Sequence, residues 1–332
     1  MAVSRFLQVF ITIFSSPLFA MTVPGDDAAS LPVPAEARTV SETSDVAVSP
    51  TGRIDTSASQ GDSKRDGERH EKSVLLRYQF RNGDVLRYRM TQVGTMKADR
   101  EEASERNVTH VDQLRRFDVR SVDDSGQARI VMRFERVEMS VARNNEEPVI
   151  FHSKMPLEDV PRLFQTSARR LRQQAPVFVA LPTGRPVNEK GEEIGAEEDE
   201  IHLMTTLPED AVAPGDSWKF YSVVKVRVTE EVQREIRLLT SYRMESFEDG
   251  IAKITFATSP ALRLRSPAVR AQLIEATPKG YFLFDVEAGR LIKRVSRNDQ
   301  SVYNAMGPNT VLTCSKETIE ELQPEEDSVS RR

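Results

Sequence analysis

Alternation of apolar and polar residues, sustained over many segments between residues 75 and 322, is the feature that most constrains the fold of this chain. Successive side chains of a β-strand point to opposite faces, so the pattern predicts strands with one buried and one exposed face. In one such segment Tyr88 and Met90 share one face and Arg89 lies on the other. We therefore expect a mainly β (α+β) domain over residues 75–322.

Short turns separate these segments. Arg81–Asp84 is predicted to turn a hairpin over residues 75–95, and further turns rich in Gly and acidic residues follow at Asp123–Gly126 and Glu287–Gly289. Such short connections favour antiparallel neighbours. A sheet of roughly ten or more long strands twists until it curls or closes. The predicted architecture is a strongly bent antiparallel sheet or an open barrel.

One segment, between Pro156 and Gln174, has the period of a helix instead. Val160, Phe164 and Ala168 recur at four-residue steps with arginines on the opposite side, which predicts one amphipathic helix. Such a helix can lie on a membrane, but in a β context we expect it on the concave side of the sheet. A shorter helical stretch is expected around residues 267–275.

Three turn motifs occur twice in the same order. Gly83-Asp84 is echoed by Gly215-Asp216, Asp124–Ile130 by Glu248–Ile254, and Gly184-Arg185 by Gly289-Arg290. Each motif alone is an ordinary turn, but the shared order predicts a duplicated unit. We expect two similar halves, pseudo-repeats over about residues 75–206 and 207–322.

The Gly-Asp-x-Leu-Arg-Tyr motif that starts at Gly83, the stretch Leu207–Trp218 and the hairpin Gly280–Leu291 together resemble an uncharacterised family of secreted bacterial proteins of the planctomycete type. The resemblance covers residues 75–322 and implies neither an activity nor functional residues. The strand plan is also similar, at the level of the fold, to periplasmic lipoprotein carriers, which wrap a bent sheet around helices.

The N-terminus predicts export. Residues 1–20 resemble a secretory signal peptide, with Arg5 before the apolar run Phe6–Phe14. That run is shorter than the roughly 20 residues that cross a bilayer, so no transmembrane span is expected after cleavage. An uncleaved interfacial anchor is the alternative. Residues 21–74 and 323–332 are polar and are predicted to be a disordered linker and tail. The protein is therefore expected in the periplasm or outside the cell.

The charge pattern argues against nucleic acid as a partner. The chain has 46 Lys and Arg against 51 Asp and Glu, a formal net charge of −5, whereas nucleic-acid-binding proteins present an excess of cations. Arginines nevertheless recur at alternate strand positions, for example Arg87, Arg89 and Arg133. They form either a solvated face that meets carboxylates across strands or a surface for an anionic glycan or lipid headgroup.

Common motifs of catalysis and metal binding are missing from the sequence. It has no Gly-x-Ser-x-Gly elbow, no phosphate-binding glycine loop, no His-Glu-x-x-His and no cysteine pair. The one cysteine, Cys314, lies in a strand pattern and is expected to serve as a small apolar side chain. An acidic segment with Glu197, Asp199 and Glu200 is a candidate for Ca²⁺, or else a solvated loop. We expect no cofactor and a protein that is not an enzyme.

The apolar face of the predicted sheet supplies the remaining candidate site. Its side chains are either packed core or, if the helix leaves the concavity open, the lining of a pocket for a lipid or other apolar ligand. The candidate residues are Tyr78, Tyr88, Met132, Phe134, Trp218, Phe220 and Phe256. The sequence favours a non-catalytic exported binding, carrier or scaffold protein of the cell envelope, with a lipid or envelope component as partner. The alternative is a carboxylate-dependent hydrolase of an extracellular polymer.

Overall fold

A computed structural model describes residues 73–101, 103–173, 177–187, 204–228 and 232–324. The predicted signal peptide, almost all of the linker, the acidic segment and most of the tail lie outside the described residues. The strands are β1 (Val85–Arg100), β2 (Ala103–Val122), β3 (Ala128–Arg143), β4 (Val149–His152), β5 (Val177–Ala180), β6 (Pro186–Val187), β7 (Ser217–Arg227), β8 (Gln233–Glu248), β9 (Ile251–Pro260), β10 (Lys279–Asp285), β11 (Arg290–Tyr303) and β12 (Thr310–Leu322). The helical elements are η2 (Leu157–Asp159), η3 (Arg162–Phe164), α2 (Gln165–Leu171) and α3 (Pro267–Gln272).

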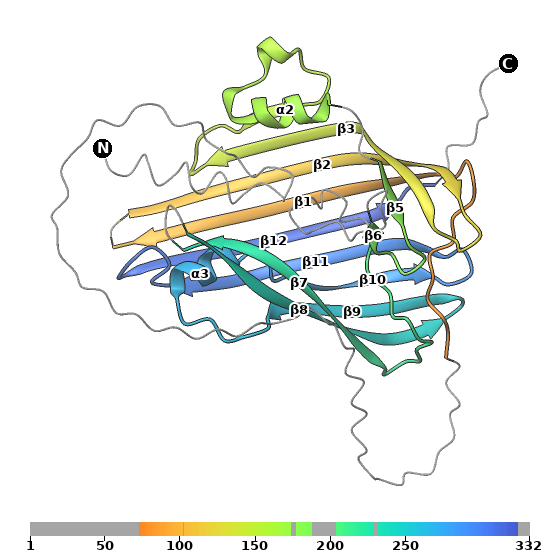
Figure 1. Cartoon of the computed structure of the whole chain (residues 1–332). Helices are drawn as coiled ribbons and strands as arrows, with labels where there is room; N and C mark the ends of the chain where they lie inside the picture. The colour runs from red at the N-terminus through yellow and green to blue at the C-terminus, as the bar shows by residue number, and fades with distance from the viewer. Residues whose placement is uncertain (1–72, 102, 174–176, 188–203, 229–231, 325–332) are drawn as a thin grey trace, which may run out of the picture. The chain divides into compact units, whose positions relative to one another are not determined.

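The strands form one 12-stranded sheet in the order β6-β5-β3-β2-β1-β12-β11-β10-β9-β8-β7, with β4 beside β3. Every pair is antiparallel. The first and last long strands, β1 and β12, meet in the middle, and β6 and β7 are the two edges of the described sheet (Figure 1). The predicted mainly β fold with an open antiparallel sheet is confirmed.

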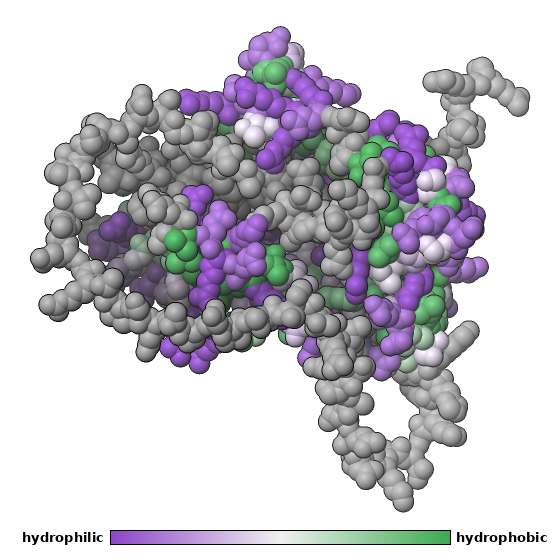
Figure 2. Space-filling view, in the orientation of Figure 1, coloured by the Kyte–Doolittle hydropathy of each residue, from purple (hydrophilic) through white to green (hydrophobic). Residues whose placement is uncertain are grey.

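The sheet is strongly bent, because strands from its two ends share one core. Phe178 of β5 and Met244 of β8 lie near opposite ends of the strand order, yet both belong to one hydrophobic cluster. Tyr88 of β1 and Phe282 of β10 belong to the same cluster. We call the side of the sheet that carries this cluster the inner face and the opposite side the outer face. Over the part of the surface visible in Figure 2, hydrophilic residues surround smaller hydrophobic groups.

The chain enters β1 and β7 through the same set of hydrogen bonds. Gly83 N donates to Val119 O (3.0 Å) and Val119 N to Asp84 O (2.9 Å). In the second segment Gly215 N donates to Met244 O (2.9 Å) and Met244 N to Asp216 O (3.0 Å). Gly83 and Gly215 both have positive φ, 87° and 99°, which glycine adopts without strain.

A matching bulge follows in both segments. The pairing of β2 with β3 shifts register between Val119 and Ser121, and the pairing of β8 with β9 shifts between Met244 and Ser246. The echoed motifs therefore share hydrogen bonds and strand register, whereas a duplication of the whole unit stays a prediction.

The predicted hairpin over residues 75–95 is wrong. β1 continues to Arg100, and the segment before it pairs elsewhere: Val74 bridges to Val212, and Gln79 N donates to Gly289 O (2.9 Å). The alternation of Leu76 and Tyr78 reflects burial, since both are buried, and not pairing with the next strand.

The helical segment covers the inner face over β1, β2, β3 and β4, as predicted. Phe164 and Ala168 pack against Met90, Val111 and Phe151. The α-helix itself is short, because the turns η2 and η3, each preceded by a proline, take up the first part of the segment. The second predicted helix is α3, where the Ser266 hydroxyl accepts from Val269 N.

Candidate functional site on the inner face

Buried polar side chains interrupt the apolar inner face along the central strands. Each has a relative exposure of 6% or less. We call this set the inner polar belt: Gln92, Thr109, Gln113, Arg115, Asn298 and Glu320. The cross-strand register places Met90 opposite Gln113 on one side and opposite Glu320 on the other, so these residues share a face with the core. Buried polar groups on a sheet face are costly unless they are paired, which makes the belt the feature to explain.

Ion pairs of two arginines with one glutamate form the centre of the belt. Arg115 Nη1 lies 3.5 Å from Glu320 Oε1, and Arg294 Nη1 lies 3.9 Å from Glu320 Oε2. The side chains of Arg115 and Glu320 are only 5% and 8% exposed. Glu320 stands directly opposite Arg294 on β11. Charges at this depth are weakly screened, so their balance matters for both folding and ligand binding.

Within the described residues, the Arg115 side chain makes its hydrogen bonds to one residue, Gln113, beside its ion pair with Glu320. Its Nε and Nη2 donate to Gln113 Oε1 (2.9 and 2.7 Å), and its guanidinium lies 5.9 Å from the ring centre of Phe134. Its Nη1 makes no hydrogen bond to any residue in the described part of the chain. Burial lowers the pKa of Arg115 and the Glu320 carboxylate opposes that shift. An arginine nevertheless keeps its proton in a protein, so a buried cation with an unused donor remains.

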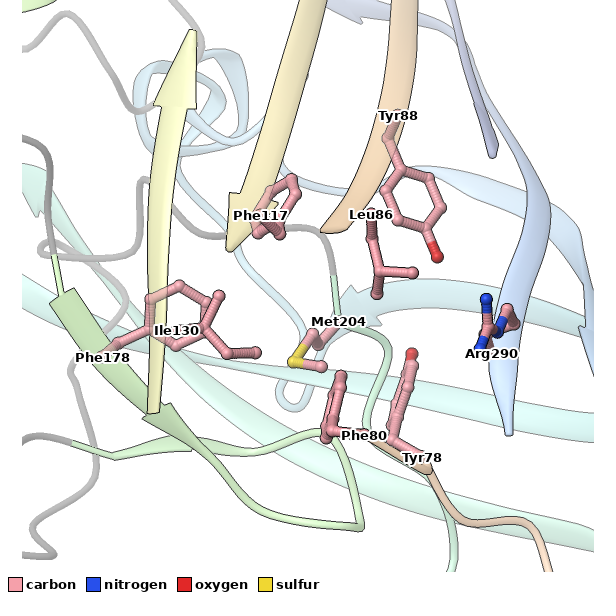
Figure 3. A pocket seen from close by; sticks show the side chains of 9 residues that line it. All are labelled: Tyr78, Phe80, Leu86, Tyr88, Phe117, Ile130, Phe178, Met204 and Arg290. Carbon is pink, nitrogen blue, oxygen red and sulfur yellow. The ribbon is translucent and has the colours of Figure 1, made fainter. Parts of the chain in front are cut away.

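Two buried tyrosines lie beside the belt. The Tyr88 hydroxyl donates to Leu291 O (2.8 Å), and the Tyr78 hydroxyl accepts from Thr205 N (3.1 Å). Burial raises the pKa of both hydroxyls above the usual range, so both stay protonated. Figure 3 shows the two hydroxyls directed towards each other next to Arg290.

A small pocket opens between these side chains (Figure 3). The rings of Tyr78, Phe80, Tyr88, Phe117 and Phe178 line it, and Arg290 borders it. Its volume is about 20 Å³, which is the room for about one water molecule. The inner face is thus mostly packed at this point, and a larger ligand requires the ends of the bent sheet to move apart.

The structure gathers most of the predicted ligand-binding residues in one place. Tyr78 and Tyr88 line the pocket, Met132 and Phe256 belong to the same cluster, and Phe134 and Trp218 pack against it. Phe220 lies near its border, with its ring edge-on to Tyr242 at 6.0 Å. Their use by a ligand stays a prediction.

The charged residues of the belt are absent from the predicted site. Arg115 and Glu320 occupy inward positions of β2 and β12, and neither residue was named in the predicted site. A signal was present for Arg115, which alternates in step with Val111 and Phe117, both buried.

Arginines of the outer face support the first of the two explanations given for them. Arg87 pairs with Glu135 (3.1 Å), and Arg89 pairs with Asp112 (2.6 Å). Arg133 lies 3.9 Å from Asp118. Arg89 and Arg133 meet carboxylates of the neighbouring strand β2, and Arg87 reaches a carboxylate on β3, two strands away, as on a solvated sheet face.

The structure adds little support for the other candidate sites. Glu197, Asp199 and Glu200 lie outside the described residues, and within those residues no group of three or more His, Cys, Asp or Glu could hold a metal ion. Cys314 is buried on the inner face, and burial raises the pKa of its thiol to about 12. Among the described helices, none is long and apolar enough to cross a membrane.

No protein-family model and no curated protein matches the chain, so the resemblance to a secreted planctomycete family gains no support. Among solved structures, the chain is similar to a DUF1329 family protein from Desulfovibrio piger, with 9% identity and a TM-score of 0.12 over 73% of this chain and 87% of that one. It is also similar to a putative outer membrane lipoprotein-sorting protein domain from Vibrio parahaemolyticus, with 9% identity and a TM-score of 0.11 over 74% of this chain and 87% of that one. The second protein is of the kind named in the predicted fold likeness, but TM-scores of this size support no inference about this chain.

Proposed function

We propose that this chain is a non-catalytic exported binding or carrier protein of the cell envelope, and that its inner face takes an amphiphilic ligand with an anionic head. The observation that carries the proposal is the buried Arg115, whose Nη1 lies 3.5 Å from Glu320 Oε1 but makes no hydrogen bond within the described residues. A buried donor without a partner costs free energy that an anionic oxygen would recover. Export rests on the signal peptide predicted for residues 1–20.

The neighbours of Arg115 fit the two parts of such a ligand. Arg290 and Arg294 bring further positive charge to the same side, and the Tyr78 and Tyr88 hydroxyls can donate or accept hydrogen bonds. The aromatic rings around the small pocket offer apolar contacts to a chain. The ligand enters by parting the two ends of the bent sheet and replacing core contacts.

The hydrolase alternative finds no favourable observation among the described residues. The inward carboxylates Glu320 and Glu275 are each paired with cations, Glu320 with Arg115 and Arg294, and Glu275 with Lys316 at 3.0 Å. Hydrolysis of a glycosidic bond needs one carboxyl group that donates a proton, and a neighbouring cation opposes protonation.

Titration with a fluorescent long-chain fatty acid, and with the alcohol of the same chain length, tests the proposal. The acid is expected to bind at least about tenfold more tightly than the alcohol, because one charge-assisted hydrogen bond is worth roughly 1.5–3 kcal/mol. Arg115→Gln should bring the acid to the affinity of the alcohol. Arg116→Gln is the matched control, since Arg116 is the next residue along β2 and pairs with Asp118 on the outer face (2.8 Å).

Lipid extraction gives an independent check. The purified chain, extracted with organic solvent and analysed by mass spectrometry, should release an anionic lipid, and circular dichroism should confirm that both variants are folded. Equal affinity for acid and alcohol, together with an extract free of lipid, would overturn the proposal.

A further inference from the structure

The sheet ends on one side in a long strand. β7 has 11 residues and pairs only with β8 among the described strands, whereas the opposite edge, β6, has two residues. A long edge strand exposes unpaired N–H and C=O groups and can template another strand.

The hydrogen bonds near the end of β7 show which backbone groups point outward. Val228 N donates to Val232 O (2.8 Å), so the backbone N–H of Val228 points towards β8. Arg227 N donates to Gln272 Oε1 (2.8 Å), and Gln272 Nε2 donates to Arg227 O (2.7 Å). The backbone N–H and C=O of Arg227 therefore point away from β8. In an antiparallel ladder the direction alternates with every residue. The backbone groups of Val223, Tyr221 and Lys219 therefore also face outward.

Gln272 shows what the outer edge of β7 can bind. Its side-chain amide donates to the carbonyl of Arg227 and accepts from its N–H, as a residue of a neighbouring strand would. This contact occupies one end of the edge. The outward groups of Tyr221 and Val223 lie further along the strand.

The side chains on this row are basic and apolar. β7 contains two lysines and one arginine and no acidic residue. Tyr221 is 55% exposed and Val223 is 43% exposed. Arg237 of β8 stacks on Tyr221, with its guanidinium 4.2 Å from the ring centre. Lys225 stands opposite a glutamate of β8, whereas Lys219 stands opposite a serine.

We propose that the edge of β7 binds an extended peptide segment with acidic side chains, which joins the sheet as an additional strand. Strand addition supplies backbone hydrogen bonds, and alternate side chains supply specificity. Acids on the incoming strand would stand beside Lys219 and the stacked pair of Tyr221 and Arg237.

Two of the registers in which β7 could pair with the β7 of a second copy bring like charges together, which an acidic strand avoids in every register. A two-fold pairing of β7 centred on Ser222 sets Lys219 opposite Lys225, and one centred on Val223 sets Lys219 opposite Arg227. Like charges directly opposite each other in a sheet are destabilising. The charge pattern therefore favours a different, acidic partner over self-association.

A short labelled peptide of alternating Val and Glu is the probe, with two control peptides. One control replaces Glu with Lys, and the other is N-methylated along the edge that would pair. Fluorescence anisotropy with the full chain is expected to give at least about tenfold tighter binding of the Glu peptide than of either control. Equal binding of the Lys or N-methylated peptide overturns the proposal, and this outcome needs no variant of the protein.

Variants of the edge complete the test. Val223→Pro removes an outward N–H without removing a bond to β8 and should abolish binding, whereas Val223→Thr keeps the N–H and should bind as the wild type does. Lys219→Glu should weaken binding of the Glu peptide and strengthen that of the Lys peptide. A folded Val223→Pro variant that still binds, or a wild-type dimer that Val223→Pro converts to a monomer, would overturn the proposal.

Discussion

Each face of β12 carries a glutamate that pairs with arginine, but one pair is exposed and the other is buried. Glu317 lies on the outer face, pairs with Arg297 and is 40% exposed. Glu320 lies three positions further on the inner face, pairs with Arg115 and Arg294 and is 8% exposed. An exposed pair contributes about 0–1 kcal/mol, whereas removing one partner of a buried pair costs about 3–5 kcal/mol. The comparison teaches that the number of ion pairs on this sheet says little about stability until the face is known.

Removing the buried carboxylate gives the largest expected effect. Glu320→Gln leaves Arg115 buried without its counter-charge, so the free energy of unfolding should fall by about 3–5 kcal/mol. Chemical denaturation followed by circular dichroism measures this change. Glu317→Gln on the same strand is the matched control and should cost no more than about 1 kcal/mol. Similar losses for the two variants would contradict the division between the faces.

Removing a buried hydroxyl is expected to give the next largest loss of stability. Tyr88→Phe removes the buried hydrogen bond from the hydroxyl to Leu291 O, which should cost about 0.5–1.5 kcal/mol. Tyr303→Phe is the control, because Tyr303 is 67% exposed and its loss should stay within about 0.5 kcal/mol. Thermal and urea denaturation of both variants measure the difference. A neutral Tyr88→Phe would mean that a water replaces the hydroxyl in the small pocket.

Local sequence signals predicted the elements of this fold well. The Gly-Asp motifs predicted turns at Gly83 and Gly215, and the structure places the same hydrogen bonds after both. Alternation predicted which residues of β1 are buried, among them Tyr88 and Met90. These features depend on neighbouring residues along the chain, so sequence alone can indicate them.

Contacts between distant strands could not be predicted in the same way. Gln92 and Thr318 are 226 positions apart, and their hydrogen bond depends on the register of β1 against β12. The same register brings Glu320 close to Arg115. Alternation assigns a residue to a face but not to a partner on another strand. The aromatic part of the candidate site was therefore predicted, and its charged centre was not.

The smallest effect concerns an outer-face carboxylate and depends on pH. Partial burial acts to raise the pKa of Asp112, but hydrogen bonds and charge from Arg89 and Arg136 outweigh it and hold the pKa below its usual range. A lowered folded-state pKa adds stability above the unfolded value of about 3.9, and that stability is lost as the pH falls through the folded value. Asp112→Asn should therefore cost less than about 1 kcal/mol at neutral pH and nothing once the carboxyl is protonated in both states.

Urea denaturation from neutral to strongly acidic pH, at low and high salt, measures this dependence. The Asp112→Asn difference should shrink with added salt, because exposed charges are screened within about 10 Å at 0.1 M ionic strength. The cost of Glu320→Gln should change little with salt, because the side chains of Arg115 and Glu320 are only 5% and 8% exposed. If salt reduced both differences equally, the inner polar belt would be open to solvent. Its ion pairs would then contribute to folding no more than those of the outer face.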